Sequence, residues 1–332
     1  MQIDIKARKV EPVRQTYTHL KERFGKDKPA SRYQEAVMDV QARENFHYRP
    51  TWEPDKELYD PSRTQIQMAD WYKLLDPRQY YYGTYCMARQ RHQDSMEQNF
   101  KFVERRGLKD VMPEEIRALV LSHVTPLRHY EWGAYLNNNQ ICHRGYGTSI
   151  TAPAALNAAD RVGNAQYITR IALLLSDNDP AVLDAAKQAW MEHDDLQPVR
   201  RLVEDSLVTE DWFELFVAQN IAMDGILHPL VFDRFEKRAT GEGDALFAML
   251  GEFTVLWFDE EKRWADRQVQ VAAAESPENK ALLSGWYGKW RDLAVQAVRP
   301  LATALLGDAG AGAVDELAAD MDARMQKIGL EI

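Results

Sequence analysis

The chain has 332 residues, 45% of them hydrophobic, and a formal net charge of −10. This negative charge argues against nucleic acid or an anionic membrane surface as the main partner. The sequence begins with a charged stretch and not with the apolar core of a secretory signal, and its longest aliphatic runs, such as IALLL at 171–175, are too short to cross a bilayer. Its two cysteines form no CxxC pattern and are expected to be reduced thiols, so we expect a cytoplasmic protein.

Residues 1–90 lack the pattern of a compact helical domain. Three prolines between positions 50 and 61 interrupt the stretch, and only a short helix at 31–43, with Ser31 as N-cap, is predicted. The many aromatic residues still need a surface, which is either the chain's own bundle or another subunit. We predict an extended arm that packs chiefly on other subunits. The interface candidates are Phe46, Tyr48, Trp52, Tyr59, Trp71 and Tyr72.

The segment 76–107 is predicted to be the first long helix, ending at Gly107. Its helical stripe, with steps of three and four residues, consists of Tyr82, Tyr85, Arg89, His92, Met96 and Phe100. Aromatic residues in such a stripe are usually core.

Helical periodicity then continues almost without a break, and no alternating strand pattern appears. Prolines at 126 and 229 are expected to bend their helices. The predicted helices cover 113–143, 152–175, 180–193, 196–207, 210–238, 244–274, 277–306 and, after a glycine-rich loop, 313–328. The sequence therefore predicts an all-α protein with an arm at 1–90, a helical bundle at 91–306, and a C-terminal loop and short helix at 307–332.

Common catalytic motifs are absent from the sequence. It has no P-loop, dinucleotide-binding fingerprint, GxSxG elbow or HExxH motif. Lone histidines on or beside apolar helical faces, such as His123 and His129, are expected to be core residues and not metal ligands.

A carboxylate-bridged di-iron bundle needs a glutamate from each of two helices and a Glu-x-x-His motif from each of two more. The chain contains one such motif, Glu44 to His47, in the proline-rich front where no four-helix core is plausible. A site that needs two motifs cannot be built from one. We therefore predict a helical bundle that lacks di-iron ligands and binds no iron in its core.

The residues at the positions where metal ligands would be expected can still be identified on the predicted helices. Glu131 lies in the apolar stripe of the helix at 113–143, where a carboxylate must be paired. Arg161 is always cationic and cannot bind iron, but it could neutralise Glu131. On the last helix either Trp257 and Glu260, or Glu261 and Trp264, face the centre. The vestigial ligand positions are Glu131, Arg161, Asn164, Met223, Glu261 and Trp264.

Three stretches carry a resemblance to a known family: DWYKLLDPRQYYYGTY, LRHYEWGAYLNNNQI and DRVGNAQ. They resemble the β subunit of the hydroxylase in soluble bacterial multicomponent monooxygenases, nearest to the phenol hydroxylase branch. The resemblance implies a ferritin-like subunit without iron in an (αβγ)₂ assembly whose di-iron centre lies in α. It also implies a regulatory protein and a reductase that carries FAD and an iron–sulfur cluster and takes electrons from NADH. No catalytic, cofactor-binding or metal-binding residue is implied for this chain.

Other functions remain open at this point. The chain could be the β subunit of a toluene- or alkane-type monooxygenase. It could be a stand-alone ferritin-like metal oxidase that uses Glu131, Glu252, Glu260 and nearby histidines. A metal-free helical protein that binds a small aromatic ligand is a further alternative.

Overall fold

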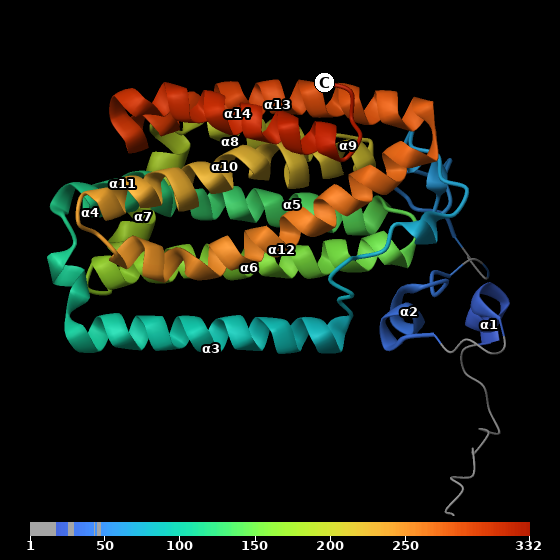
Figure 1. Cartoon of the computed structure of the whole chain (residues 1–332), viewed down its shortest axis with the longest axis horizontal. Helices are drawn as coiled ribbons and strands as arrows, with labels where there is room; N and C mark the ends of the chain where they lie inside the picture. The colour runs from blue at the N-terminus through green and yellow to red at the C-terminus, as the bar shows by residue number, and fades with distance from the viewer. Residues whose placement is uncertain (1–17, 26–29, 43, 45–47) are drawn as a thin grey trace, which may run out of the picture.

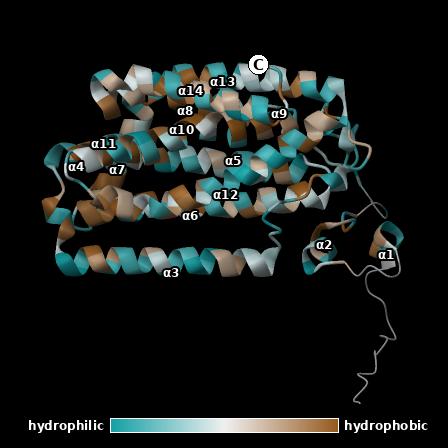
Figure 2. Cartoon of the chain, in the orientation of Figure 1, coloured by the Kyte–Doolittle hydropathy of each residue, from teal (hydrophilic) through white to brown (hydrophobic). Residues whose placement is uncertain are grey.

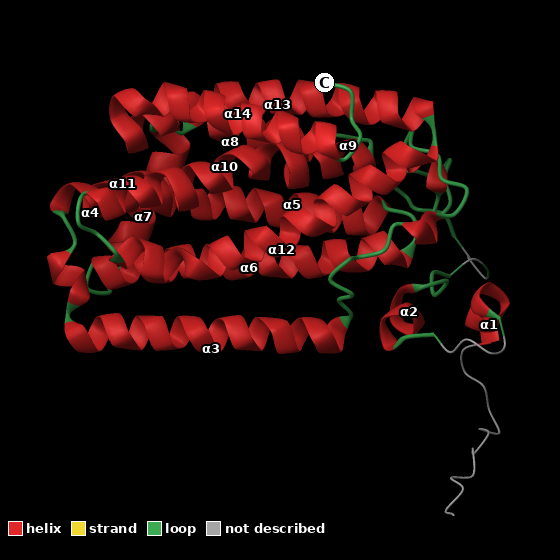
Figure 3. Cartoon of the chain, in the orientation of Figure 1, coloured by secondary structure: helices red, strands yellow, loops and turns green. Residues whose placement is uncertain are grey.

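The computed structural model describes residues 18–25, 30–42, 44 and 48–332. Within these ranges the chain is helical, and no strand is present (Figure 3). The first half contains α1 (Thr18–Phe24), α2 (Arg32–Val37), the 3₁₀ turns η1 (Pro61–Arg63) and η2 (Trp71–Lys73), α3 (Tyr82–Arg106), η3 (Leu108–Val111), α4 (Glu114–Leu119), η4 (Val120–Val124), η5 (Thr125–Leu127) and α5 (Arg128–Arg144). The predicted all-α fold is confirmed.

The second half contains the remaining helical segments, among them the longest helices of the chain. They are α6 (Thr148–Leu175), α7 (Ala181–Glu192), α8 (Gln197–Leu207), α9 (Trp212–Val217), η6 (Ala218–Met223), α10 (Asp224–Pro229), η7 (Leu230–Phe235), α11 (Glu236–Gly241), α12 (Leu246–Glu275), α13 (Pro277–Leu306), η8 (Gly307–Ala309) and α14 (Gly310–Lys327). Three of the short segments, η4, η6 and η7, are π-helical.

The bundle is elongated, and its long helices run along the same axis (Figure 1). The centre is formed by α5, α6, α12 and the continuous helix from α9 to α11. Helices α13 and α14 lie along one edge of the view, and α3 lies along the opposite edge. The visible face of α3 is mostly hydrophilic (Figure 2), whereas Met96, Phe100 and Val103 on the same helix are buried. Helix α3 is therefore an outer, amphipathic member of the bundle.

The helix from Trp212 to Gly241 is the most enclosed part of the bundle. By length and composition it could cross a membrane, but 94% of its most apolar stretch is buried inside the protein. The aliphatic runs in this helix are short, so run length alone does not reveal how apolar the helix is. The burial explains the composition, because a helix that is covered all round needs apolar side chains on every face.

Two predicted boundaries differ from the structure at the ends of the bundle. Helix α3 begins at Tyr82 and not near 76, after a proline-containing turn. The glycine-rich stretch predicted as a loop at 307–312 is helical, as η8 and the start of α14. Gly310 makes this possible, because a Cβ there would lie about 2.5 Å from the Ala302 carbonyl oxygen on α13.

The arm is more attached to its own bundle than predicted. Trp71 and Tyr72 are 8% and 4% exposed, so these two interface candidates were wrong: Trp71 packs against Trp212 of the bundle, and Tyr72 covers a small cluster with residues of α1 and α2. Ser31 is the N-cap of α2, as predicted, and forms a capping box with Gln34; the helix ends earlier than predicted, at Val37. Phe46 lies outside the described residues.

Exposed aromatic side chains remain on the arm. Tyr48, Trp52 and Tyr59 are 78%, 55% and 38% exposed, respectively. Large apolar side chains at this exposure are typical of surfaces that another protein covers. Their role as interface residues stays a prediction.

Candidate functional site

Four helices bring charged side chains together in the middle of the bundle. Glu131 comes from α5, Arg161 from α6, Asp224 from α10 and Glu261 from α12. All four are buried, with at most 3% of each exposed. Ionised groups at this depth are stable only with partners of opposite charge or hydrogen bonds.

Arg161 is the centre of this cluster. Its Nη1 donates to Asp224 Oδ1 at 3.0 Å and lies 3.4 Å from Glu131 Oε2, and its Nη2 donates to Asp224 Oδ2. Its guanidinium carbon lies 4.4 Å from the centre of the Trp257 ring. Burial alone would lower the pKa of Arg161, but the charges of Asp224 and Glu131 outweigh it and raise the pKa. The guanidinium is thus an internal cation shared by two carboxylates.

Glu131 is paired, as the sequence predicted. Its Oε2 faces Arg161 and accepts a hydrogen bond from Asn164 Nδ2 at 3.5 Å, while its Oε1 lies 3.1 Å from His228 Nε2. Burial favours the neutral acid, but Arg161 and His228 have the larger combined effect and lower the pKa of Glu131. The carboxylate is therefore held ionised inside the bundle.

Asp224, and not Met223, reaches the cluster from the third helix. Met223 is buried in the apolar core, whereas Asp224 accepts hydrogen bonds from the Tyr130 hydroxyl at 2.6 Å and from Gln219 Nε2 at 3.0 Å. The two residues are neighbours: Met223 is the last residue of the π segment η6, and Asp224 is the first of α10. A π segment has more residues per turn than an α-helix, so counting in α-helical steps selects the wrong neighbour.

On α12 the residues that face the centre are Trp257 and Glu261, one from each of the two alternative pairs. Trp257 stacks on Arg161, and Glu261 is fully buried. Trp264 is also fully buried, but its ring packs against Phe216 at 5.1 Å. The indole of a tryptophan is only a donor, so Trp264 cannot replace the ligating histidine.

Glu261 differs from the other carboxylates because neither of its oxygens has a hydrogen-bond partner among the described residues. Burial, followed by the negative charge of Asp224, raises the pKa of Glu261 to about 8, against a partly opposing effect of Arg161. At neutral pH this side chain is consequently held as the uncharged acid.

We predict that this proton makes stability depend on pH. The folded carboxyl keeps its proton up to about pH 8, whereas the unfolded one releases it near 4.5, so the free energy of unfolding should fall as the pH rises between these values. Glu261→Gln mimics the neutral acid and should be more stable than the wild type by about 3 kcal/mol at pH 7, with no difference near pH 4.

Urea denaturation of the full chain from pH 4 to 8 measures this difference. Glu252→Gln is the matched control, because Glu252 is an exposed glutamate on the same helix. Parallel stability curves for wild type and Glu261→Gln over this range would show that the buried carboxyl is not the source.

A second ionic layer joins α3 to the bundle beside the cluster. Asp160 accepts hydrogen bonds from Arg89 Nε at 2.7 Å and from the Tyr85 hydroxyl at 2.8 Å. Arg89 Nη1 also donates to Glu260 Oε2 at 2.8 Å. Glu260 is therefore a partner of α3 and not part of the central cluster.

The alternative ligand set of Glu131, Glu252 and Glu260 does not converge. Glu131 points at Arg161, Glu260 is bound by Arg89, and Glu252 accepts from Asn99 Nδ2 of α3 at 3.2 Å. The central cluster does not fit two iron ions either. A permanent cation occupies its middle, and Arg161 and Asn164 stand where Glu-x-x-His would be needed.

Comparison with known proteins identifies the family. A family model described as Methane/Phenol/Alkene Hydroxylase matches residues 52–276. The oxygenase component DmpL of phenol 2-monooxygenase from Pseudomonas sp. (strain CF600) is 44% identical over 331 residues, which covers 100% of this chain and 99% of DmpL. The hydroxylase component subunit beta of the toluene-4-monooxygenase system from Ectopseudomonas mendocina is 24% identical over 248 residues, covering 73% of this chain and 75% of that subunit.

The fold agrees with these relatives. A crystal structure of xenon-pressurized phenol hydroxylase from Pseudomonas sp. OX1 matches with a TM-score of 0.93 and 42% sequence identity, and the match covers 99% of both chains. The ferritin-like bundle and the family that the sequence resembles are thereby confirmed. This chain belongs to the methane/phenol/alkene hydroxylase family.

Proposed function

We propose that this chain is the non-catalytic β-type subunit of a phenol hydroxylase. It supports a di-iron α subunit that inserts one oxygen atom from O₂ into phenol-type substrates with electrons from NADH. The observation that carries this proposal is the position of Arg161, whose guanidinium takes the place of a metal between Glu131 and Asp224. The near full-length relatives are oxygenase components of phenol 2-monooxygenases, which favours the same function.

The relatives also indicate what kind of complex the chain belongs to. They are oxygenase or hydroxylase components of multicomponent monooxygenases, so this chain acts within a hetero-oligomeric complex. We propose an (αβγ)₂ hydroxylase in the cytoplasm, served by a regulatory protein and a reductase with FAD and an iron–sulfur cluster. The net charge of −10 argues against nucleic acid or a membrane as a further partner.

The degree of sequence identity to the relatives favours phenol over toluene or propane as the substrate of the complex. The phenol 2-monooxygenase components are 44% and 43% identical to this chain, whereas the toluene-4-monooxygenase and propane 2-monooxygenase subunits are 22–24% identical. Substrate choice itself is expected to be made in the α subunit.

Co-expression tests the proposal. The full chain is purified alone and together with the α and γ subunits, and iron content and phenol turnover are measured for each preparation. We expect iron and turnover only in the preparations that contain α. About two iron ions bound to the isolated chain would favour a metal oxidase instead.

We further predict that the central cluster has no part in turnover. Glu261→Gln keeps the shape of the neutral acid, so the assembled hydroxylase should retain its iron content and its turnover rate within about twofold, because the variant alters no group that contacts iron in the α subunit. Iron analysis and single-substrate kinetics on the complex check this. Loss of iron in proportion to the variant subunit would assign the metal to this chain.

A further inference from the structure

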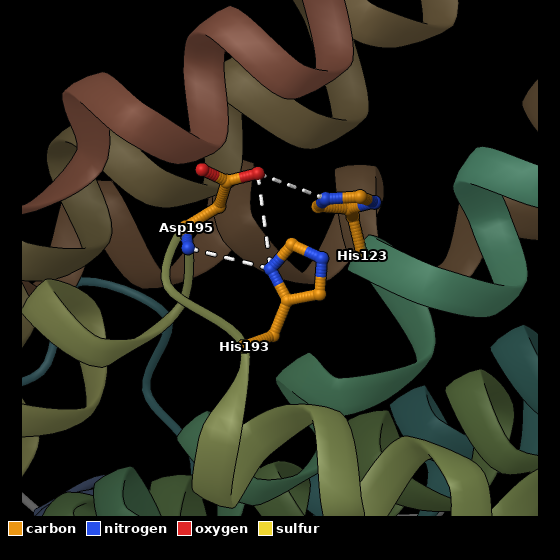
Figure 4. A group of neighbouring side chains, drawn as sticks. All are labelled: His123, His193 and Asp195. Carbon is orange, nitrogen blue, oxygen red and sulfur yellow. Dashed lines mark hydrogen bonds and ion pairs between the residues drawn. The ribbon is translucent and has the colours of Figure 1, made fainter.

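A second group of potential metal ligands lies outside the central cluster. His123 belongs to the π segment η4, and His193 and Asp195 belong to the connection between α7 and α8 (Figure 4). No sequence pattern connects them, because His123 lies about seventy residues before the other two in the chain. In the fold, one ligand atom of each residue lies within 4.8 Å of the others.

The spacing suits a tetrahedral metal. Asp195 Oδ2 lies 3.4 Å from His123 Nε2 and 3.8 Å from His193 Nδ1. Zinc bonds to nitrogen and oxygen of about 2.0–2.1 Å place neighbouring ligands of a tetrahedron roughly 3.3–3.5 Å apart. Small side-chain rotations would therefore bring all three atoms onto one ion.

The hydrogen bonds around His123 fit the tautomer that a metal-binding histidine needs. The Ser122 hydroxyl donates to the Ala118 carbonyl at 2.7 Å, so its oxygen is left to accept, and it lies 2.7 Å from His123 Nδ1. In the tautomer with the proton on Nδ1, His123 donates to the Ser122 oxygen, and its Nε2 lone pair faces Asp195 Oδ2, as a metal ligand requires. Such an outer hydrogen bond is the usual support of a metal-bound histidine.

His193 presents a second lone pair to the same carboxylate. The backbone N–H of Asp195 donates to His193 Nδ1 at 3.3 Å, so this nitrogen carries no proton. That hydrogen bond uses the single lone pair of His193 Nδ1, so His193 would exchange it for a bond to the metal, whereas His123 Nε2 and Asp195 Oδ2, 3.4 Å apart, are stabilised by a cation between them.

We propose that His123, His193 and Asp195 bind a divalent transition-metal ion of the zinc type, which fastens the α7–α8 connection to η4. Two imidazoles and one carboxylate are a common ligand set for Zn²⁺. His123 is the buried ligand, whereas His193 and Asp195 are partly exposed, so the ion reaches the site from solvent and water completes its coordination. This site is separate from the Arg161 cluster and does not depend on the proposed oxygenase function.

Zinc binding to the tag-free full-length protein, alone or in its complex, tests the proposal. The ion is titrated in competition with a chromophoric chelator, and the zinc absorption edge reports the ligands. We expect one tightly bound zinc per chain beyond any metal held by partners, with nitrogen and oxygen neighbours near 2.0 Å and an imidazole signature.

Two variants remove ligands with little change of shape. Asp195→Asn removes the charged ligand, and His193→Asn keeps an acceptor for the Asp195 backbone N–H. Each should weaken zinc binding by about 100-fold or more, and Ser122→Ala, which removes the outer hydrogen bond, by about 10-fold to 100-fold. His143→Asn, a histidine in the last turn of α5, should bind zinc like the wild type.

Circular dichroism confirms that each variant is folded before binding is compared. A thermal shift on adding zinc is expected for the wild type and His143→Asn and not for the ligand variants. The proposal is overturned if the wild type binds zinc no more tightly than Asp195→Asn and His193→Asn. In that case the three side chains form only a polar contact between η4 and the α7–α8 connection.

Discussion

Replacing Arg161 with methionine is expected to lower the free energy of unfolding by about 3–5 kcal/mol. The variant keeps an apolar side chain of similar length over Trp257 but leaves Glu131 and Asp224 buried without their shared cation. Urea denaturation of the full chain, followed by circular dichroism, measures the loss.

Arg170→Met is the matched control. It lies on the same helix and also stacks on an aromatic ring, that of Phe100, but its ion pair with Glu97 is about one-third exposed. We expect a loss below about 1 kcal/mol for this variant. Adding Asp224→Asn to Arg161→Met should recover part of the stability, because one uncompensated charge is removed. Equal losses for the two arginines would refute the central role of Arg161.

Removing exposed aromatic side chains from the arm is expected to break the assembly. The double variant Tyr48→Ala/Trp52→Ala should weaken association with the α subunit by about 100-fold or more, because anchor residues of an interface contribute about 2 kcal/mol each. Their exposure, 78% and 55%, predicts that folding of this chain is unaffected. Co-purification and titration of the purified subunits measure the effect.

Trp132→Ala provides the comparison for the arm. Trp132 on α5 is 54% exposed, close to the exposure of Trp52, but it lies on the bundle. We expect this variant to assemble with α like the wild type. If the arm variant still assembles at full stoichiometry and activity, the arm is not an interface.

The positions of most helices could be predicted because apolar residues recur at helical steps and capping residues interrupt them. Gly107 ends α3 with a left-handed φ of 62°, as its sequence position suggested. The same logic failed at 307–312, because Gly310, which in the sequence indicates a loop, is needed there for close contact between α13 and α14. Local sequence carries no information about that neighbour.

The central cluster was only partly predictable. A carboxylate on an apolar stripe requires a partner, which led from Glu131 to Arg161, and the structure confirms this pair. Asp224 and His228 were missed because the π segment η6, which precedes them, alters the helical count. The burial of Trp71 was missed for another reason: composition shows that an aromatic residue needs cover but does not show which surface covers it.

The central cation of this bundle is an amino-acid side chain, so every molecule contains it and no cation has to be taken up from solution. Where a metal ion holds a core together, the free energy of unfolding rises with the concentration of that metal. Arg161 is present once in every molecule, so this core has the same stability in iron-starved and iron-rich cells. Folding at this centre has no metal-loading step, so a chain made during iron starvation folds there as it does when iron is plentiful.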